Sequence, residues 1–287
     1  METHLSSRTK HVIISPEHPF VIIGERINPT RRKSLLESLA RGDFSVALEE
    51  AQKQIAAGAH VLDVNAGVPD ADEPKLLQDL VCALVQVVDA PLCFDSANPA
   101  ALQAALSVYE GKALINSTTG EEKMLNAVLP LAAKYRAAII GVITDDAGVP
   151  ATPEARLGVA RKIVQRAADF NIPREDVVID CLALAVCTDS TAARVTLDTM
   201  RLVQQELGVN LSLGASNVSF GLPNRVALNT AYLALGIARG MTAAITDPTV
   251  PEIATTIRAC DLLMGHDEYA MRWIKAYRAA QGGKRKT

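Results

Sequence analysis

The 287-residue sequence is poor in aromatic side chains, which make up 4% of it, although 49% of its residues are apolar. An interior built mainly from Ala, Val, Ile and Leu is typical of barrels, in which layers of aliphatic side chains interleave. The sequence also lacks any apolar run near the roughly 18 to 20 residues that a membrane span needs, and its start has no continuous apolar stretch. We therefore expect a protein that neither spans a membrane nor is exported.

An excess of one charge sign is missing as well. The 29 Lys and Arg residues nearly balance the 32 Asp and Glu residues, for a net charge of -3. A nucleic-acid-binding surface needs a basic excess to neutralise phosphates, so we expect no nucleic-acid partner. The five cysteines are scattered and form no Cys-X-X-Cys pair, which is typical of reduced thiols and predicts a cytoplasmic location.

The sequence does contain eight short apolar runs, each of which ends at a polar residue. The runs end at Glu25, Asn65, Asp95, Asn116, Asp145, Asp180, Asn217 and Asp247. Runs rich in Val, Ile and Leu that alternate with helical patterns indicate buried parallel strands joined by right-handed helical crossovers. Eight such units predict an α/β fold of the TIM (β/α)8 barrel type.

No segment is long enough to act as a linker, so we expect residues 1–287 to form a single domain. Residues 1–19 precede the first apolar run and are expected to be an N-terminal extension. A C-terminal helix is predicted at about 268–280, packing through Met271, Trp273, Ile274 and Tyr277.

The ends of the strands lack several kinds of catalytic group. None of the five histidines and no lysine falls at a predicted strand end, which disfavours zinc hydrolases and Schiff-base aldolases. The sequence also lacks a Gly-X-Ser-X-Gly elbow, a Walker phosphate loop and a Gly-X-Gly-X-X-Gly motif after the first strand. The mechanism therefore has to rely on carboxylates, amides and hydroxyls.

Those groups form a predicted ring at the carboxyl ends of the strands, where barrels place their active sites. Its members are Asp63, Asn65, Asp95, Asn116, Asp145, Asp180, Ser216, Asn217 and Asp247. Carboxylates accept hydrogen bonds and Asn amides both donate and accept them, so the ring suits a neutral heterocycle such as the 2-aminopyrimidinone of a pterin. Two alternatives stay open: the side chains cap the following helices, or two or more carboxylates hold a cation such as Mg²⁺.

Several segments together resemble the methyltetrahydrofolate:corrinoid methyltransferases. They are residues 24–28 (GERIN), 63–65 (DVN), 94–96 (FDS), 115–118 (INST), 179–180 (ID) and 216–220 (SNVSF), with Asn224 and Arg225 just beyond. The resemblance runs in order from about residue 20 to the C-terminal helix. It implies a pterin-binding barrel, similar to that of dihydropteroate synthase, which transfers a methyl group between N5 of tetrahydrofolate and the cobalt of a corrinoid on a separate protein.

The resemblance also implies roles for individual residues. Asp95, Asn116 and Asp180 would hold the pterin, and Asn217 would hydrogen-bond near N5 and act as the catalytic residue. Further substrate contacts are implied at Ser219, Phe220, Arg225 and Ile245, and we expect Asp63 and Asn65 in the same substrate site. The substrate would be tetrahydrofolate or 5-methyltetrahydrofolate, with no protein-bound metal, a transient corrinoid-protein partner and a homodimeric assembly.

Two positions depart from the family pattern. Phe220 stands where some relatives have Gln, which replaces a polar folate contact by an aromatic wall, and Cys181 stands where some have Pro. The direction of transfer is not encoded, although wide use of the family in bacteria favours methylation of tetrahydrofolate, as in O-demethylation systems. Two rivals remain: a non-catalytic folate-binding module, and a dihydropteroate synthase-like enzyme, which would need a Lys and an Arg that residues 211–217 lack.

Overall fold

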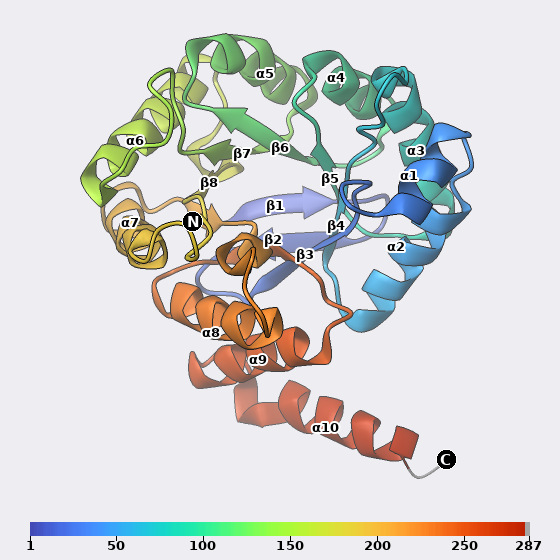
Figure 1. Cartoon of the computed structure of the whole chain (residues 1–287), viewed down its shortest axis with the longest axis vertical. Coiled ribbons are helices and arrows are strands. Elements are labelled where there is room, and N and C mark those ends of the chain that lie inside the picture. Colours follow the sequence, from blue (N-terminus) through green and yellow to red (C-terminus); the bar gives the residue numbers. More distant parts are fainter. Residues whose placement is uncertain (285–287) are drawn as a thin grey trace.

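The computed structural model describes residues 1–284 and shows a barrel of eight parallel strands surrounded by helices (Figure 1). The strands are β3 (Val21–Ile27), β4 (Val61–Val64), β5 (Leu92–Asp95), β6 (Leu114–Thr119), β7 (Ala138–Val142), β8 (Val177–Asp180), β9 (Asn210–Ser212) and β10 (Ala243–Thr246). They pair in chain order, and β10 pairs with β3. A parallel bridge between Gly214 and Ile245 joins the remaining two edges. The predicted TIM barrel is confirmed.

Helices follow the strands and form the outer layer. They are α1 (Lys33–Ala40), α2 (Ser45–Ala57), α3 (Glu73–Val87), α4 (Pro99–Val108), α5 (Glu122–Tyr135), α6 (Pro153–Asp169), α7 (Ala192–Leu207), α8 (Arg225–Ala238), α9 (Pro251–Leu263) and α10 (Met271–Lys284). Asp72, Asn98 and Thr152 begin α3, α4 and α6 by accepting a backbone N–H of the first turn, and each is followed by a proline within that turn. These side chains satisfy N–H groups that the helix leaves free, which fixes where each helix starts.

Apolar side chains fill the barrel interior up to the level of the strand ends. The inner cluster contains Val21, Ile23, Val61, Cys93, Leu114, Ala138, Ile140, Val178 and Ala243. A larger cluster lies between the strands and the helices. Because successive residues of a strand point to opposite faces, one apolar run serves both layers.

The N-terminal segment forms an antiparallel hairpin of β1 (Thr3–Ser6) and β2 (His11–Ile14), which the sequence did not reveal. Leu5 and Ile14 are fully buried and pack against the inner cluster of the barrel. The Asn210 side chain on β9 donates hydrogen bonds to Thr3 Oγ1 (2.9 Å) and to the Ile14 carbonyl (2.7 Å). The hairpin therefore fills the amino end of the barrel.

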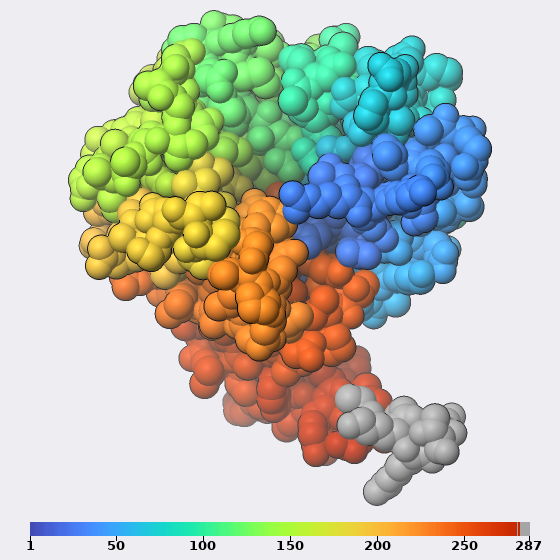
Figure 2. All heavy atoms as spheres, in the orientation of Figure 1, coloured from blue at the N-terminus to red at the C-terminus, as the bar shows by residue number. Residues whose placement is uncertain are grey.

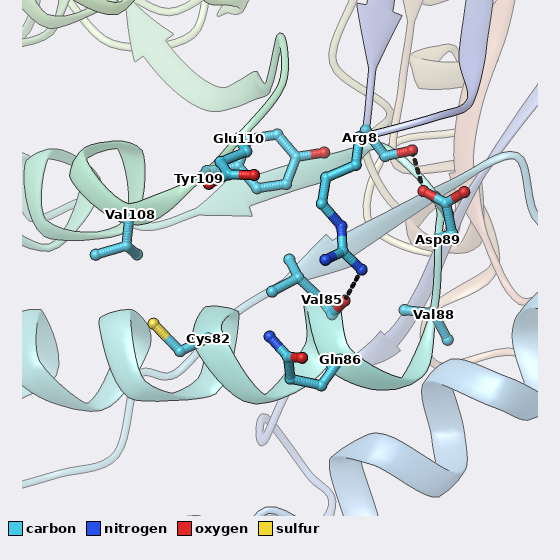
Figure 3. Close-up of a pocket in the computed structure, with 11 residues that line it drawn as sticks. Arg8, Cys82, Val85, Gln86, Val88, Asp89, Val108, Tyr109 and Glu110 are labelled. Atoms are coloured by element: carbon cyan, nitrogen blue, oxygen red, sulfur yellow. Dashed lines mark hydrogen bonds between the residues drawn. The ribbon is translucent and has the colours of Figure 1, made fainter.

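A small cavity of about 180 Å³ lies beside the hairpin connection, between the ends of α3 and α4 (Figure 3). Arg8 donates to the Val85 carbonyl at the end of α3 (3.1 Å), and Asp89 accepts a hydrogen bond from Ser7 (2.5 Å). The residues that line this cavity come from the hairpin connection and from the C-terminal ends of α3 and α4 with the residues just after them. None of the strand-end ring residues lines it. These contacts attach the hairpin to the helical layer.

The C-terminal helix α10 begins at Met271 and extends away from the ring of helices (Figure 1). The expectation that its apolar residues pack is wrong for Met271, Ile274 and Tyr277, which are 65%, 38% and 63% exposed; Trp273 is half-buried. The start of the helix is fixed instead by Asp267, whose carboxylate accepts two backbone N–H groups of its first turn. Within residues 1–284, no helix is long and apolar enough to cross a membrane.

Candidate functional site

A cavity of about 710 Å³ opens at the carboxyl ends of the strands. Figure 2 looks onto this face, where the blue segment after β3 meets the orange segment after β9. Of the predicted site residues, the cavity is lined by Asp63, Asp95, Asn116, Asn217, Phe220, Arg225 and Ile245. Asn65, Asp180 and Ser219 are not among the residues that line it. Ser216 and Asp247 of the predicted ring also line the cavity, whereas Asp145 does not.

Asp63 on β4 and Asn116 on β6 form a hydrogen-bonded pair. The Asn116 Nδ2 donates to Asp63 Oδ1 at 3.1 Å. Burial, and then the neighbouring Asp95 charge, raise the pKa of Asp63 well above its usual value. Among the described residues no donor engages Asn116 Oδ1, so this oxygen remains an acceptor for a bound molecule.

Asp95 ends β5 and is held by two amides. Asn28 Nδ2 and Asn65 Nδ2 donate to its Oδ2 at 3.2 and 3.0 Å. Burial raises the pKa of Asp95, and the hydrogen bond from Asn65 opposes that rise. Asn65 therefore orients the Asp95 carboxylate. Among the described residues no hydrogen bond engages Oδ1 of Asp95, which leaves this oxygen available to a molecule in the cavity that Asp95 lines.

Asp180 ends β8 and is only 9% exposed. It accepts a backbone hydrogen bond from Leu182 N (2.7 Å), and burial raises its pKa to about 6. The same turn is braced by the buried Arg156, which donates to the carbonyls of Cys181 (3.1 Å) and Leu182 (3.2 Å). The position of the Asp180 carboxyl is thus set by the turn that follows its own strand.

Asn217 lies beyond the end of β9, in a 3-10 helix, η2 (Ala215–Ser219). Arg225 braces this helix by donating to the Ser216 carbonyl (2.7 Å) and to Ser219 Oγ (3.0 Å). Ser219 is fully buried and supports Arg225. Among the described residues, no hydrogen bond engages the side-chain amide of Asn217, which faces the cavity.

Gly214 leaves the space that this amide occupies. A Cβ atom at position 214 would lie 2.9 Å from Asn217 Nδ2, closer than side-chain atoms pack. The side-chain interactions that would make Asn217 a helix cap or a loop brace are therefore missing from the part of the chain that is described.

The cavity also contains Glu25, which the predicted ring omitted. Ser216 Oγ donates to Glu25 Oε1 at 2.9 Å. Burial is the largest cause that raises the pKa of Glu25 from 4.5 to about 7, and the Asp247 charge adds to it. The signal was present in the sequence, because Glu25 ends the first apolar run.

Asp145 and Asp247 of the predicted ring each accept a backbone hydrogen bond within the turn that follows them. Asp145 Oδ1 accepts the Ala147 N–H within a tight turn (2.9 Å), so its place in the predicted ring is wrong. Asp247 Oδ1 accepts the Thr249 N–H (2.9 Å) just before α9, while its Oδ2 pairs with Arg26 at 3.3 Å. In the described part of the chain, no group of three or more His, Cys, Asp or Glu side chains is arranged to hold a metal ion.

The chain is similar in sequence to known proteins. The chain is 29% identical over 271 residues to the methylcorrinoid:tetrahydrofolate methyltransferase of Eubacterium limosum, covering 92% of this chain and 98% of that protein. It is 28% identical over 245 residues to the methionine synthase of Mycobacterium leprae, covering 81% of this chain and 20% of that protein.

Solved structures show the same fold. The structure of a Yersinia pestis dihydropteroate synthase with a pterine-sulfa conjugate superposes with a TM-score of 0.67 at 17% sequence identity. The match covers 91% of this chain and 98% of the synthase chain. The sequence profile of the pterin binding enzymes matches residues 24–247, which span the barrel from β3 to the end of β10. The chain therefore belongs to the pterin binding enzyme family.

Proposed function

We propose that this protein is a methyltransferase that moves a methyl group between N5 of tetrahydrofolate and the cobalt of a corrinoid on a separate protein. The observation that carries the proposal is the unpartnered Asn217 amide, which faces a cavity lined by hydrogen-bond acceptors in a pterin-binding barrel. The name of the Eubacterium limosum relative, a methylcorrinoid:tetrahydrofolate methyltransferase, supports the same chemistry.

The pterin ring would bind on Asp95, Asn116 and Asp180. A pterin presents adjacent N–H donors, and the raised pKa values of Asp95 and Asp180 reflect carboxyl groups that have lost water without gaining enough donors. N–H groups of the bound ring would replace those missing donors. Asp63 would act by orienting Asn116, and Asn65 by orienting Asp95.

Asn217 would serve the chemical step. When the methyl group leaves N5, the electron pair of the broken carbon–nitrogen bond stays on N5, which is a poor leaving group unless that charge is stabilised. In the direction towards tetrahydrofolate, the N5 lone pair attacks the methyl group, the electron pair of the methyl–cobalt bond stays on cobalt, and N5 gives up its proton. The two directions share one transition state, in which the Asn217 amide can donate a hydrogen bond to N5 without being an acid. A corrinoid on the partner protein supplies the cobalt that accepts or donates the methyl group, so the chain's main contribution is positioning, with no covalent enzyme intermediate.

We propose that the physiological direction of methyl transfer is from the corrinoid to tetrahydrofolate, which is the direction that the name of the Eubacterium limosum relative gives for that protein. The chain would then complete a demethylation pathway, such as O-demethylation, by accepting the methyl group of a methylcorrinoid protein. An open cavity mouth is consistent with this role, because the cobalt has to come within bonding reach of N5. The complex with the corrinoid protein would be transient.

We also propose a homodimer, and the exposed apolar side chains at the C-terminal end give it a surface. Leu263, Tyr269, Met271 and Tyr277 are 83%, 85%, 65% and 63% exposed on α9, η3 (Glu268–Ala270) and α10. Clustered exposed apolar groups of this kind mark association sites. A second copy of the chain would cover them and leave the barrel mouth open, because α10 projects outside the ring of helices (Figure 1).

A single-turnover experiment tests the proposed activity. The protein, tetrahydrofolate and methylcobalamin are mixed with and without a corrinoid protein, and the loss of the methyl-cobalt absorbance is followed. Transfer that requires this chain supports the methyltransferase. Tight folate binding without any transfer would instead identify a folate-binding module, and formation of dihydropteroate from a pterin pyrophosphate and p-aminobenzoate would identify a synthase.

A further inference from the structure

The side chain of Phe220, at the rim of the cavity, is in contact with two guanidinium groups. The Arg31 guanidinium carbon lies 5.2 Å from the centre of the Phe220 ring, and that of Arg225 lies 4.7 Å from it. Arg31 belongs to the segment after β3, and Arg225 is the first residue of α8. The contact therefore joins the blue and orange segments that meet in Figure 2.

The two guanidinium charges differ from their neighbours in having no counterion. Arg26 and Arg32, which line the same cavity, pair with Glu50 at 3.5 and 3.0 Å. Within the described residues, no carboxylate lies within 4 Å of Arg31 or Arg225. Two like charges held beside one ring repel each other, and an anion between them would remove that cost.

The cavity thus has two parts of opposite character. Its inner part presents Asp63, Asp95 and the side-chain oxygen Oδ1 of Asn116, whereas its rim presents Arg31 and Arg225. A ligand that fits both parts carries N–H donors at one end and negative charge at the other. A reduced folate has this form, because its pterin ring carries the donors and its glutamate tail carries the carboxylates.

We propose that Arg31, Phe220 and Arg225 form a subsite for the glutamate tail of the folate, a step that rests on the proposed function. The aromatic ring holds the exposed Arg31 guanidinium near the mouth, and hydrogen bonds to Ser216 and Ser219 hold that of Arg225, so less conformational freedom is lost when the two groups bind carboxylates. Tails with several glutamates add carboxylates and should bind more tightly than tails with one.

The test compares three ligands by calorimetry: a tail-less tetrahydropterin, tetrahydrofolate with one glutamate, and tetrahydrofolate with three. We expect the wild-type affinity to rise in that order. Arg31→Gln should weaken the one-glutamate form about 2- to 5-fold, since one exposed ion pair is lost, and the three-glutamate form further. It should leave the tail-less ligand unchanged. Phe220→Leu should reduce the same preference by freeing the Arg31 guanidinium, while Arg225 stays held by Ser216 and Ser219.

Lys33→Gln is the matched control, because it removes one positive charge two residues from Arg31 on an exposed side chain that pairs with Glu37. It should bind all three ligands as the wild type does. Equal loss in Lys33→Gln and Arg31→Gln would reduce the effect to overall charge and overturn the subsite. An unchanged tail preference in Arg31→Gln would overturn it as well. Slower methyl transfer from a corrinoid protein at unchanged folate affinity would also overturn it, because Arg31 would then contact the corrinoid protein and not the folate tail.

The two proposals fail in different ways. A wild-type protein that binds the tail-less pterin as tightly as both folates would overturn the tail subsite and leave the methyltransferase proposal standing. A protein that binds none of the three ligands would overturn the proposed function itself.

Discussion

Replacing Glu25 by Gln should stabilise the protein at high pH and have little effect at low pH. Burial raises the pKa of Glu25 from 4.5 to about 7, so the folded protein holds this proton more tightly than the unfolded chain does. The contribution of Glu25 to stability is therefore fully present below pH 4.5 and is lost as the pH rises to about 7. The difference between the two pKa values corresponds to about 3 kcal/mol at 25 °C.

Glu25→Gln keeps the shape of the side chain and an oxygen that can accept the Ser216 hydroxyl, but it has no charge to bury. At pH 8 and without folate, we expect the free energy of unfolding of the variant to exceed that of the wild type by about 2 to 3 kcal/mol. At pH 4.5 the two proteins should differ by less than about 1 kcal/mol. The other carboxyl groups titrate in both proteins, so the comparison isolates Glu25.

Urea unfolding at both pH values measures these free energies. Glu37→Gln is the control, because the Glu37 side chain is 53% exposed on α1 and its replacement should change stability little at either pH. A Glu25→Gln variant whose stability difference from the wild type is the same at pH 4.5 and pH 8 would refute the assignment of a buried, proton-holding carboxyl in the cavity.

Three further predictions concern the ligand site, the hairpin and the assembly. Asp95→Ala and Asp180→Ala should each weaken tetrahydrofolate binding by about 1 to 3 kcal/mol in calorimetry, and unchanged affinity in both would remove the pterin from this cavity. Asn210→Ala loses two hydrogen bonds to the N-terminal hairpin and should lower the free energy of unfolding by about 1 to 3 kcal/mol, whereas a loss below about 0.5 kcal/mol in urea unfolding would contradict this anchor. Light scattering should return the mass of two chains and Leu263→Asp that of one; a wild-type monomer at micromolar concentration would contradict the dimer.

The barrel was predictable because parallel strands covered on both faces have to be apolar along their whole length. That constraint leaves eight apolar runs, and the polar residue that ends each run lies within a strand or in the segment that follows it. The hairpin was not predictable in the same way. Its strands are four residues long and expose polar side chains, and only Leu5 and Ile14 are buried in the inner cluster.

The members of the site were harder to predict than the strands, because the loop after each strand decides where a side chain points. Asp145 and Glu25 both end apolar runs, yet Asp145 lies in a tight turn and Glu25 lines the cavity. Asp180 was found at the correct strand end, but the contacts that fix its carboxyl, the Leu182 N–H and the turn that Arg156 braces, come from the loop after the strand. The contact of Arg31 with Phe220 joins residues far apart in the chain, and no local pattern encodes it.

The role of Asn217 can be measured by separating the transfer rate from folate affinity. For Asn217→Ala, single-turnover methyl transfer at saturating folate should slow by about 10- to 1000-fold, as expected when one preorganised donor is lost. Folate affinity and melting temperature should change little, because no described residue hydrogen-bonds to this amide in the folded protein. A variant that melts at a lower temperature but transfers methyl groups at the wild-type rate would contradict the catalytic role and leave Asn217 as a structural brace.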